Sequence, residues 1–167
     1  MGRALVKVRA AGEKILERAE VVERLGPGRS FRLVFTNGCF DLLHPGHVDC
    51  LERARRLGDA LLVAVNTDRS VRGLGKGPGR PLVDQDVRAR MVAALGCVDW
   101  VTLFDEETPE QLIAEVRPDV LVKGGDYSEE DVAGAEVVRG GGGRVVIMPL
   151  VPGFSTSALV RRIREGR

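Results

Sequence analysis

Several residue types are scarce in this sequence, and neither sign of charge dominates it. The 167 residues include two histidines, three cysteines, one tryptophan and one tyrosine. Lys and Arg total 25 against 24 for Asp and Glu, which gives a net charge of +1. A balance this close to zero provides no general attraction to nucleic acid or to an anionic membrane, and few aromatic side chains are present to stack on bases. We therefore expect no nucleic-acid partner and no membrane partner.

Long apolar runs and paired cysteine motifs are missing as well. No uncharged apolar run approaches the roughly 18 residues that a membrane-spanning helix needs, and the N-terminus has no apolar segment of signal-peptide length. Cys39, Cys50 and Cys97 show no CxxC spacing and cannot all pair with one another. These absences favour a reduced, cytoplasmic protein.

Three familiar site motifs are also absent. No GxGxxG follows the first apolar strand, which argues against a dinucleotide site of the usual kind, and no GxxxxGK[ST] phosphate loop occurs anywhere. No HExxH zinc pattern occurs either, because the two histidines are three residues apart with no glutamate between them. We expect no metal held by the protein's own side chains.

What the sequence does contain is an alternation of short apolar runs with amphipathic helical patterns. We predict five strands, at residues 31–36, 60–66, 98–104, 119–123 and 144–148. We predict helices at residues 10–25, 45–57, 84–95, 109–116 and 129–139 and after Ser155, and a glycine-rich loop at 67–83. Strands that are apolar throughout are typical of a parallel sheet covered on both faces. The alternation predicts a three-layer, Rossmann-like α/β fold with a five-stranded parallel sheet.

The expected domain organisation is one domain at residues 31–167, preceded by a helical extension at residues 1–30. In the helix at 84–95, four apolar residues are expected on one side: Val87, Met91, Ala94 and Leu95. Ligands of open α/β sheets bind at the carboxyl ends of the strands. The strand ends hold residues 36–38, 66–68 and 123–126 and the stretch after Met148.

The two histidines lie at the first of these strand ends. His44 and His47 flank Gly46 where a helix begins with Pro45 at its first position. Residues three apart on a helix share a face, the glycine leaves room for a bulky anion, and the helix N-terminus offers unpaired N–H groups. The arrangement predicts donors that stabilise charge on a phosphate. The alternative is that one histidine caps the helix and the other is solvated.

The segment from Gly38 to His47 resembles the HxGH signature of the nucleotidyltransferase superfamily of cytidylyltransferases and adenylyltransferases. Within that superfamily the chain resembles the D-glycero-β-D-manno-heptose 1-phosphate adenylyltransferases, which make ADP-heptose. The resemblance runs from about Phe31 to Ile163. Its motifs are FTNGCFDLLHPGH, LGDALLVAVNTD, VDWV, LVKGGDY and GFSTS, together with Arg80-Pro81 at the end of the glycine loop.

The resemblance implies four catalytic residues: His44, His47, Lys76 and Arg88. The histidines would contact the nucleotide phosphates, with His47 at the α-phosphate. Lys76 would neutralise charge that develops on pyrophosphate, although a solvated loop lysine is an equal alternative. Arg88 matches the phosphate-binding arginine of the family by its spacing from Asp99, and Arg90 is the alternative on sequence alone.

The resemblance also implies two sets of binding residues. The nucleotide-binding set is Thr36, Asn37, Gly38, Cys39, Phe40, His44, His47, Asn66, Lys123, Gly124, Asp126, Tyr127, Phe154, Ser155 and Thr156. The substrate-binding set is Asp41, Asp68 and Arg80. Four of these roles have simpler alternatives: Asp41 orders the turn, Asp68 and Ser155 cap helices, and Lys123 is solvated at the end of its strand.

The activity implied by the resemblance is transfer of AMP from ATP, with Mg²⁺, to the heptose phosphate. The expected partners are ATP, the sugar phosphate, further copies of the chain in a dimer or larger assembly, and a separate sugar kinase and phosphatase. A cytidylyltransferase for glycerol 3-phosphate, or an adenylyltransferase for another phosphate ester, is the alternative. Leu150 stands where glycerol-phosphate cytidylyltransferases carry an arginine, so CTP is not favoured. A nucleotide-binding module without chemistry is the alternative of another class.

Overall fold

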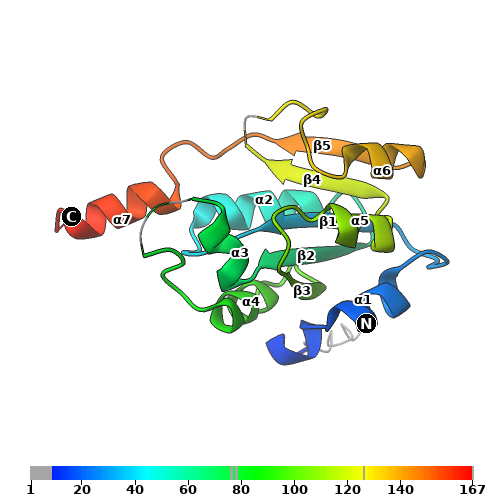
Figure 1. Ribbon diagram of the computed structural model, residues 1–167, viewed down its shortest axis with the longest axis horizontal. Helices are drawn as coiled ribbons and strands as arrows, with labels where there is room; N and C mark the ends of the chain where they lie inside the picture. Colours follow the sequence, from blue (N-terminus) through cyan, green and yellow to red (C-terminus); the bar gives the residue numbers. More distant parts are fainter. Residues whose placement is uncertain (1–8, 76, 78, 126, 167) are drawn as a thin grey trace, which may run out of the picture.

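A computed structural model describes residues 9–75, 77, 79–125 and 127–166 (Figure 1). The strands are β1 (Leu33–Gly38), β2 (Ala60–Asn66), β3 (Trp100–Phe104), β4 (Val120–Gly124) and β5 (Arg144–Met148). The helices before β3 are η1 (Ala11–Lys14), α1 (Arg18–Leu25), α2 (Pro45–Arg55), α3 (Asp68–Gly73) and α4 (Gln85–Ala93). Those after β3 are α5 (Glu110–Val116), α6 (Ala135–Gly140) and α7 (Thr156–Arg164).

The five strands form one parallel sheet in the order β3-β2-β1-β4-β5. The predicted three-layer α/β fold is therefore confirmed. The chain builds β1, β2 and β3 outward to one side and then returns to place β4 and β5 on the other. The order thus reverses between β1 and β4, and this is where an open α/β sheet forms its ligand crevice.

Each face of the sheet carries its own buried apolar cluster. Helices α1, α5 and α6 contribute to one cluster, where Leu33, Phe35 and Leu62 are fully buried. Helices α2 and α4 contribute to the other, where Val34 and Val63 are fully buried. Neighbouring residues of one strand point to opposite faces, so strands that are apolar throughout supply both clusters.

The predicted helix at residues 10–25 is wrong in its middle, because the chain there pairs with the edge of the sheet. Ile15 forms a parallel bridge with Val101, and the Leu16 N–H donates to the Val101 carbonyl over 2.9 Å. The buried Lys14 ammonium donates to the Leu95 and Val98 carbonyls over 3.1 and 2.9 Å. The N-terminal segment therefore covers the outer edge of β3, which would otherwise expose unpaired backbone groups.

Other predictions also differ from the structure. Part of the expected loop at 67–83 is helix α3, whose first turn is capped by the Thr67 hydroxyl accepting from the Ser70 N–H over 3.1 Å. The helix expected at 129–139 begins only at Ala135, as α6. The apolar side expected for α4 does not face the core, because Val87 and Met91 are 49% and 44% exposed. The buried residues of α4 are Arg88, Ala89, Val92 and Ala93.

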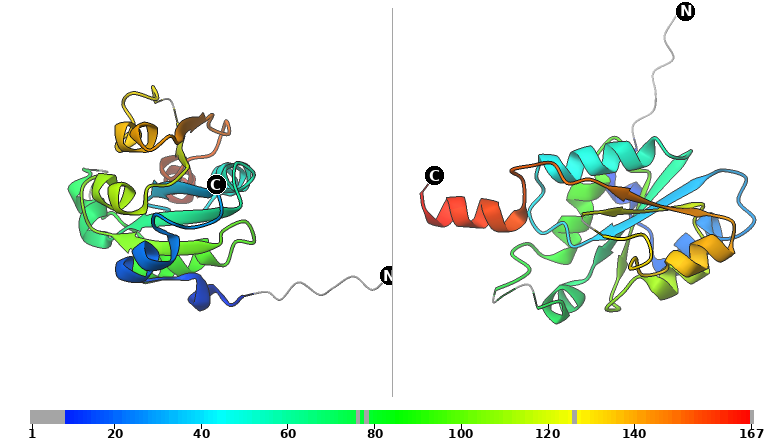
Figure 2. Two further views of the ribbon diagram at one scale, coloured as in Figure 1. Left: turned by 90° about the vertical axis from the view of Figure 1, so that its right-hand side faces the viewer. Right: turned by 90° about the horizontal axis from the view of Figure 1, so that it is seen from above.

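Helix α7 stands apart from the three layers. Figure 1 shows it extending beyond the carboxyl edge of the sheet, and the view from above in Figure 2 shows the same. None of its described residues is buried. Over the part of the chain that the structure describes, no helix is long and apolar enough to cross a membrane.

Candidate active site

A pocket of about 560 Å³ opens at the carboxyl ends of β1 and β4, where the strand order reverses. Its walls come from the turn after β1, the first turns of α2, the end of β4 and the segment from β5 into α7. Fifteen predicted site residues line it: Thr36, Asn37, Gly38, Cys39, Phe40, Asp41, His44, His47, Arg80, Lys123, Gly124, Tyr127, Phe154, Ser155 and Thr156. The topology rule thus located the pocket from the sequence.

The turn after β1 is tightly built. Phe40 has a left-handed backbone with φ of 49°, which side chains rarely adopt, and it is nearly buried. A Cβ on Gly38 would lie 3.0 Å from the Phe40 ring, so any other residue here would press on that ring. The Phe40 ring in turn lies 5.2 Å from the His47 ring, centroid to centroid. Strained backbone of this kind persists where packing holds it and is frequent at functional sites.

His44 and His47 are stacked at the start of α2. Their ring centroids are 3.7 Å apart with an angle of 19° between the planes. Two imidazolium cations this close would repel each other, and burial lowers the pKa of His44. Both effects favour a neutral His44 at neutral pH.

The Nδ1 atom of His44 is buried and makes no hydrogen bond to another residue among those described. His44 lines the pocket, so its imidazole is accessible to a ligand there.

Gly46 lies between the two imidazoles for a steric reason. A Cβ there would lie 3.1 Å from His44 Nδ1, 3.2 Å from His44 Cε1 and 3.6 Å from Phe154 Cβ. The first two distances are shorter than most real carbon contacts. Any side chain at this position would press on the His44 ring and on the wall that Phe154 contributes.

Asp41 binds protein groups rather than facing an open ligand position. It is buried, and its Oδ2 accepts from Arg80 Nη1 over 2.5 Å. Its Oδ1 accepts from the Leu82 and Val83 N–H groups over 2.7 and 3.1 Å. The alternative that Asp41 orders a turn describes this geometry, and it fixes Arg80 in the pocket wall.

Arg88 does not line the pocket, which differs from its expected role at a phosphate. Its side chain is fully buried, with Nε donating to the Val83 carbonyl over 2.8 Å and Nη1 to the Cys39 carbonyl over 2.5 Å. Its Nη2 donates to Asp68 Oδ1 over 2.7 Å. All three guanidinium nitrogens are thus used inside the protein, and Arg88 positions the turn after β1.

Asn66 and Asp68 also lie outside the pocket lining. Asn66 is buried, and its Nδ2 donates to the Ser70 hydroxyl over 2.9 Å. Asp68 is the first residue of α3 and accepts from Arg88. Both residues hold the end of β2 in place beside the site.

The end of β4 supplies the pocket with a cation and an aromatic ring. Lys123 Nζ donates to Asn37 Oδ1 over 3.3 Å and lies 5.5 Å from the centroid of the Tyr127 ring. Tyr127 is half exposed, so a flat ligand group has access to its ring. Lys76 and Asp126, two other predicted site residues, lie outside the described residues.

The last wall begins after β5. The Ser155 hydroxyl caps α7 by accepting from the Ala158 N–H over 3.1 Å, and Ser155, Thr156 and Ser157 all line the pocket. The first N–H groups of a helix carry no internal partner and attract anions. The cap and the expected phosphate contact are compatible.

Comparison with known protein families matches residues 35–162 to the cytidylyltransferase-like family. The chain belongs to this family. The D-beta-D-heptose 1-phosphate adenylyltransferase of Bordetella bronchiseptica is 54% identical over 154 residues, which cover 92% of this chain and 95% of that protein. The bifunctional protein HldE of Koribacter versatilis is 53% identical over 157 residues, which cover 93% of this chain and 32% of that protein.

Solved structures support the same family fold. The lipopolysaccharide core biosynthesis protein of Thermoplasma volcanium superposes with a TM-score of 0.61 at 29% identity, over 73% of this chain and 98% of that one. A pantothenate synthetase of Thermus thermophilus superposes with a TM-score of 0.58 at 22% identity, over 82% of this chain and 62% of that one, a likeness of fold alone. The expected kinship with the HxGH nucleotidyltransferases is confirmed.

A cytidylyltransferase-like enzyme transfers a nucleotide, and the pocket suits a nucleotide bound with its own metal. Among the described residues no cluster of histidines, cysteines or carboxylates is arranged to hold a metal ion. Asp41, the carboxylate among the described pocket residues, is already bound by Arg80 and two N–H groups. Mg²⁺ commonly keeps several waters and binds through substrate phosphates, so it fits this site as part of the ATP substrate.

Sequence reasoning missed several lining residues: Cys50, Leu51, Val71, Met148, Pro149, Val151 and Ser157. Cys50 could have been predicted from the sequence, because it lies three residues after His47 and residues three apart share a helix face. Burial raises the pKa of the Cys50 thiol, which keeps it protonated and apolar. The others are apolar or small, and only the tertiary arrangement shows that they face a pocket.

Proposed function

We propose that this chain transfers AMP from ATP to D-glycero-β-D-manno-heptose 1-phosphate, which yields ADP-heptose and pyrophosphate. The observation that carries the proposal is the stacked histidine pair around Gly46 at the start of α2, inside the pocket at the strand reversal. The 54% identity to a relative named D-beta-D-heptose 1-phosphate adenylyltransferase supports the choice of acceptor.

The reaction needs one substitution at phosphorus. An oxygen of the sugar phosphate attacks the α-phosphorus of ATP, and the bond from that phosphorus to the oxygen bridging to the β-phosphate breaks. The electron pair leaves with pyrophosphate. Because the attacking phosphate is already anionic, no general base is required, and catalysis rests on positioning and charge stabilisation.

The chain's residues act as donors around the reacting phosphates. His44 and His47 lie side by side at the phosphates, with His47 at the α-phosphate. The N-terminus of α7 faces the same space and supplies N–H groups with Ser155 and Thr156. Lys76 and Asp126 belong to the proposal through the family resemblance, with Lys76 at the pyrophosphate and Asp126 beside Tyr127 at the nucleoside. Mg²⁺ bound to the ATP phosphates would supply positive charge that offsets the charge of the leaving pyrophosphate.

Several wider features belong to the same proposal. The sugar phosphate is supplied in this proposal by a sugar kinase and a phosphatase that act before the adenylyl transfer. The chain works in the cytoplasm, where ATP is made available, and assembles with copies of itself. Tyr127 and Leu150, both exposed in the pocket wall, lie where a base can pack.

The test is release of pyrophosphate with ATP, CTP or GTP and with heptose 1-phosphate or glycerol 3-phosphate as acceptor. We expect turnover with ATP and heptose 1-phosphate alone. His47→Ala should lower kcat by roughly 10² or more, the scale for loss of one transition-state donor. Asp49→Asn on the same helix is the matched control, since Asp49 is 45% exposed and pairs only loosely with Arg53 at 3.5 Å.

Each other outcome contradicts a stated part of the proposal. Wild-type rates in His47→Ala would remove the proposed mechanism. A preference for CTP and glycerol 3-phosphate would identify a cytidylyltransferase instead. Tight ATP binding without pyrophosphate release for any acceptor would identify a binding module.

A further inference from the structure

Helix α7 has no packing partner within the part of the chain that the structure describes. Its nine residues extend beyond the sheet in both views, and none of them is buried. Isolated helices shorter than about 12 residues are marginal in water, and most helices in proteins are stabilised by packing. The helix would therefore gain from a surface that the described residues of its own chain do not provide.

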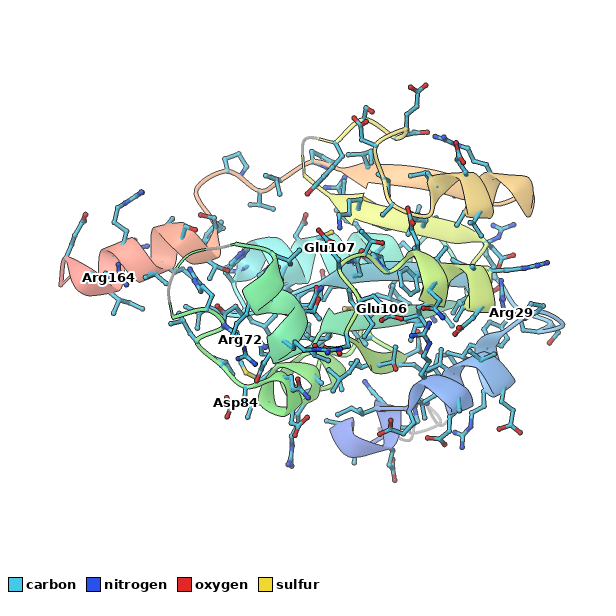
Figure 3. All side chains as sticks on the ribbon, viewed as in Figure 1. Arg29, Arg72, Asp84, Glu106, Glu107 and Arg164 are labelled. Carbon is cyan, nitrogen blue, oxygen red and sulfur yellow. The ribbon has the colours of Figure 1, made fainter. Side chains whose placement is uncertain are left out.

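Helix α7 carries an apolar stripe beside a basic surface. Leu159, Val160 and Ile163 are spaced along one side of the helix; Leu159 and Val160 are half-buried, and Ile163 is 69% exposed. The basic residues of its last turn are Arg161, Arg162 and Arg164. Figure 3 shows Arg164 at the far end of the helix, away from the rest of the protein.

A second surface without a partner lies on the outer side of α4. Val87 and Met91, one turn apart, are 49% and 44% exposed, and Leu82 just before the helix is 50% exposed. Asp84 and Asp86 stand exposed at its N-terminal end. Arg90 is also exposed on this helix, so the acidic character is confined to its first turn. Contiguous exposed apolar residues with a charged rim are typical of interaction sites.

The two surfaces complement each other in apolar character and in charge. Each offers a short apolar stripe, and the basic end of α7 opposes the acidic beginning of α4. An antiparallel arrangement of the two helices would also set the negative C-terminal end of the α7 dipole beside the positive N-terminal end of α4.

We infer that α7 of one copy docks on the α4 surface of a second copy, and that the second copy returns the same contact. Here the α4 surface means Leu82, Val87 and Met91 with Asp84 and Asp86. A reciprocal contact closes as a two-fold dimer, because each chain contributes both surfaces. The exchange also doubles the buried area, which matters for a helix this short.

The docked helix bears on the site as well as on the assembly. Ser155, Thr156 and Ser157 line the pocket and begin α7, so whatever fixes α7 also fixes the N–H groups at its N-terminus. One copy then holds a wall of the other copy's pocket. This consequence rests on the proposed function, whereas the dimer itself does not.

The first test is the mass of the full chain in solution, measured by sedimentation velocity without any substrate. We expect twice the chain mass of 18.1 kDa for the wild type. Ile163→Glu and Met91→Glu should each give the single-chain mass, and neither side chain is buried, so the fold should survive. Val137→Glu on α6, where Val137 is 37% exposed, is the matched control and should stay dimeric.

Mixing the two variants tests which surfaces meet. The Met91→Glu chain keeps an unchanged α7, and the Ile163→Glu chain keeps an unchanged α4 surface. A mixed dimer of the two variants therefore contains one unchanged contact between α7 and α4. We expect the mixture to recover a dimer that neither variant forms alone. A monomeric wild type would overturn the inference, and so would dissociation by Ile163→Glu without any effect of Met91→Glu.

The second test is activity against enzyme concentration. Turnover per chain should fall at least several-fold as the dimer dissociates on dilution, and the Ile163→Glu variant should show the low value throughout. Unchanged turnover in a demonstrably monomeric variant would overturn the link between α7 docking and the site. A dimer with no pyrophosphate release would leave the interface standing and contradict only the proposed function.

Discussion

At Gly46, adding one methyl group should lower the activity of the protein without lowering its stability. Gly46→Ala places a Cβ 3.1 Å from His44 Nδ1, which forces the imidazole to shift by a few tenths of an ångström. The same change favours the α2 helix, because alanine is the better helix former, by up to about 1 kcal/mol in a helix interior and by less in the first turn, where Gly46 lies. We expect kcat/KM to fall at least about tenfold, with a melting temperature equal to or above that of the wild type.

Steady-state pyrophosphate release and thermal unfolding of the same preparation check this expectation. Gly12→Ala is the control, since a Cβ at Gly12 meets no heavy atom within 4 Å. A Gly46→Ala enzyme with full activity would show that the His44 position tolerates displacement. A large loss of stability would show instead that the added Cβ displaces the backbone of α2 rather than the His44 ring.

The histidine pair was predictable from the sequence, and the role of Arg88 was not. His44 and His47 follow an apolar strand at helical spacing around a glycine, so local rules place them together at a strand end. The expected phosphate role of Arg88 came from its spacing to Asp99, which carries no information about burial. A buried arginine is acceptable only because Val83, Cys39 and Asp68 supply acceptors, and those contacts span up to 49 residues of sequence.

Arg88 connects three elements, so its replacement should lower the free energy of unfolding of the whole domain. Its guanidinium links α4 to the turn after β1 through Cys39 and to the start of α3 through Asp68. Arg88→Met keeps the apolar stem but leaves the Asp68 carboxylate and two carbonyls without their donor. Removing one member of a buried ion pair costs about 3–5 kcal/mol, so we expect a loss of that size in the free energy of unfolding.

Urea unfolding measures this loss, with Arg72→Met as the control because Arg72 is exposed on α3. The control should stay within about 0.5 kcal/mol of the wild type. Arg88→Lys should fall between the two, since it keeps the charge without the planar fork. Equal stability of Arg88→Met and the wild type would contradict the connecting role.

At the scale of elements, the sequence predicted strands correctly where both faces of the strand are buried. It failed where the conformation of a segment depends on a partner far away in the sequence. The bounds of β2 and β5 agree with the expected 60–66 and 144–148, because a strand that is apolar on both faces leaves a continuous apolar run. The segment at 10–25 has a helical pattern, yet its middle is extended because Ile15 and Leu16 pair with the edge of β3. On α4, the apolar Val87 and Met91 are exposed, which no periodicity rule foresees.

At the scale of the whole molecule, ion pairs join the N-terminal segment and the two halves of the sheet. Arg18 of α1 pairs with Glu106 after β3 and with Glu115 of α5 over 2.8 Å. Arg29 pairs with Asp119 over 2.6 Å, and the same carboxylate accepts from the Leu33 N–H over 2.7 Å. Figure 3 shows Arg29 at the end of the molecule opposite α7. Asp119 thereby ties the start of β1 to the start of β4.

The pH dependence of stability should show the contribution of the Asp119 carboxylate and its hydrogen bonds. Burial raises the pKa of Asp119, but the hydrogen bonds from Arg29 and the Leu33 N–H outweigh it and leave the pKa below its usual 3.8. As pH falls, the unfolded chain takes up the proton first, so the stabilisation is present above about pH 4 and is lost as pH falls through the folded-state pKa. Asp119→Asn should cost about 1 kcal/mol at pH 7, since the carboxylate is 45% exposed and solvent weakens its bonds.

Urea unfolding of the wild type and Asp119→Asn from pH 7 to pH 3 measures the difference directly. The gap should be constant down to about pH 4 and should narrow below that, because the wild-type carboxyl also becomes neutral. Asp49→Asn is the matched control: Asp49 is also 45% exposed, but its ion pair with Arg53 is 3.5 Å long and joins two residues of one helix. Its cost should stay below about 0.5 kcal/mol at every pH. A gap for Asp119→Asn that stays constant to pH 3 would mean that packing, rather than the charge, joins β1 to β4.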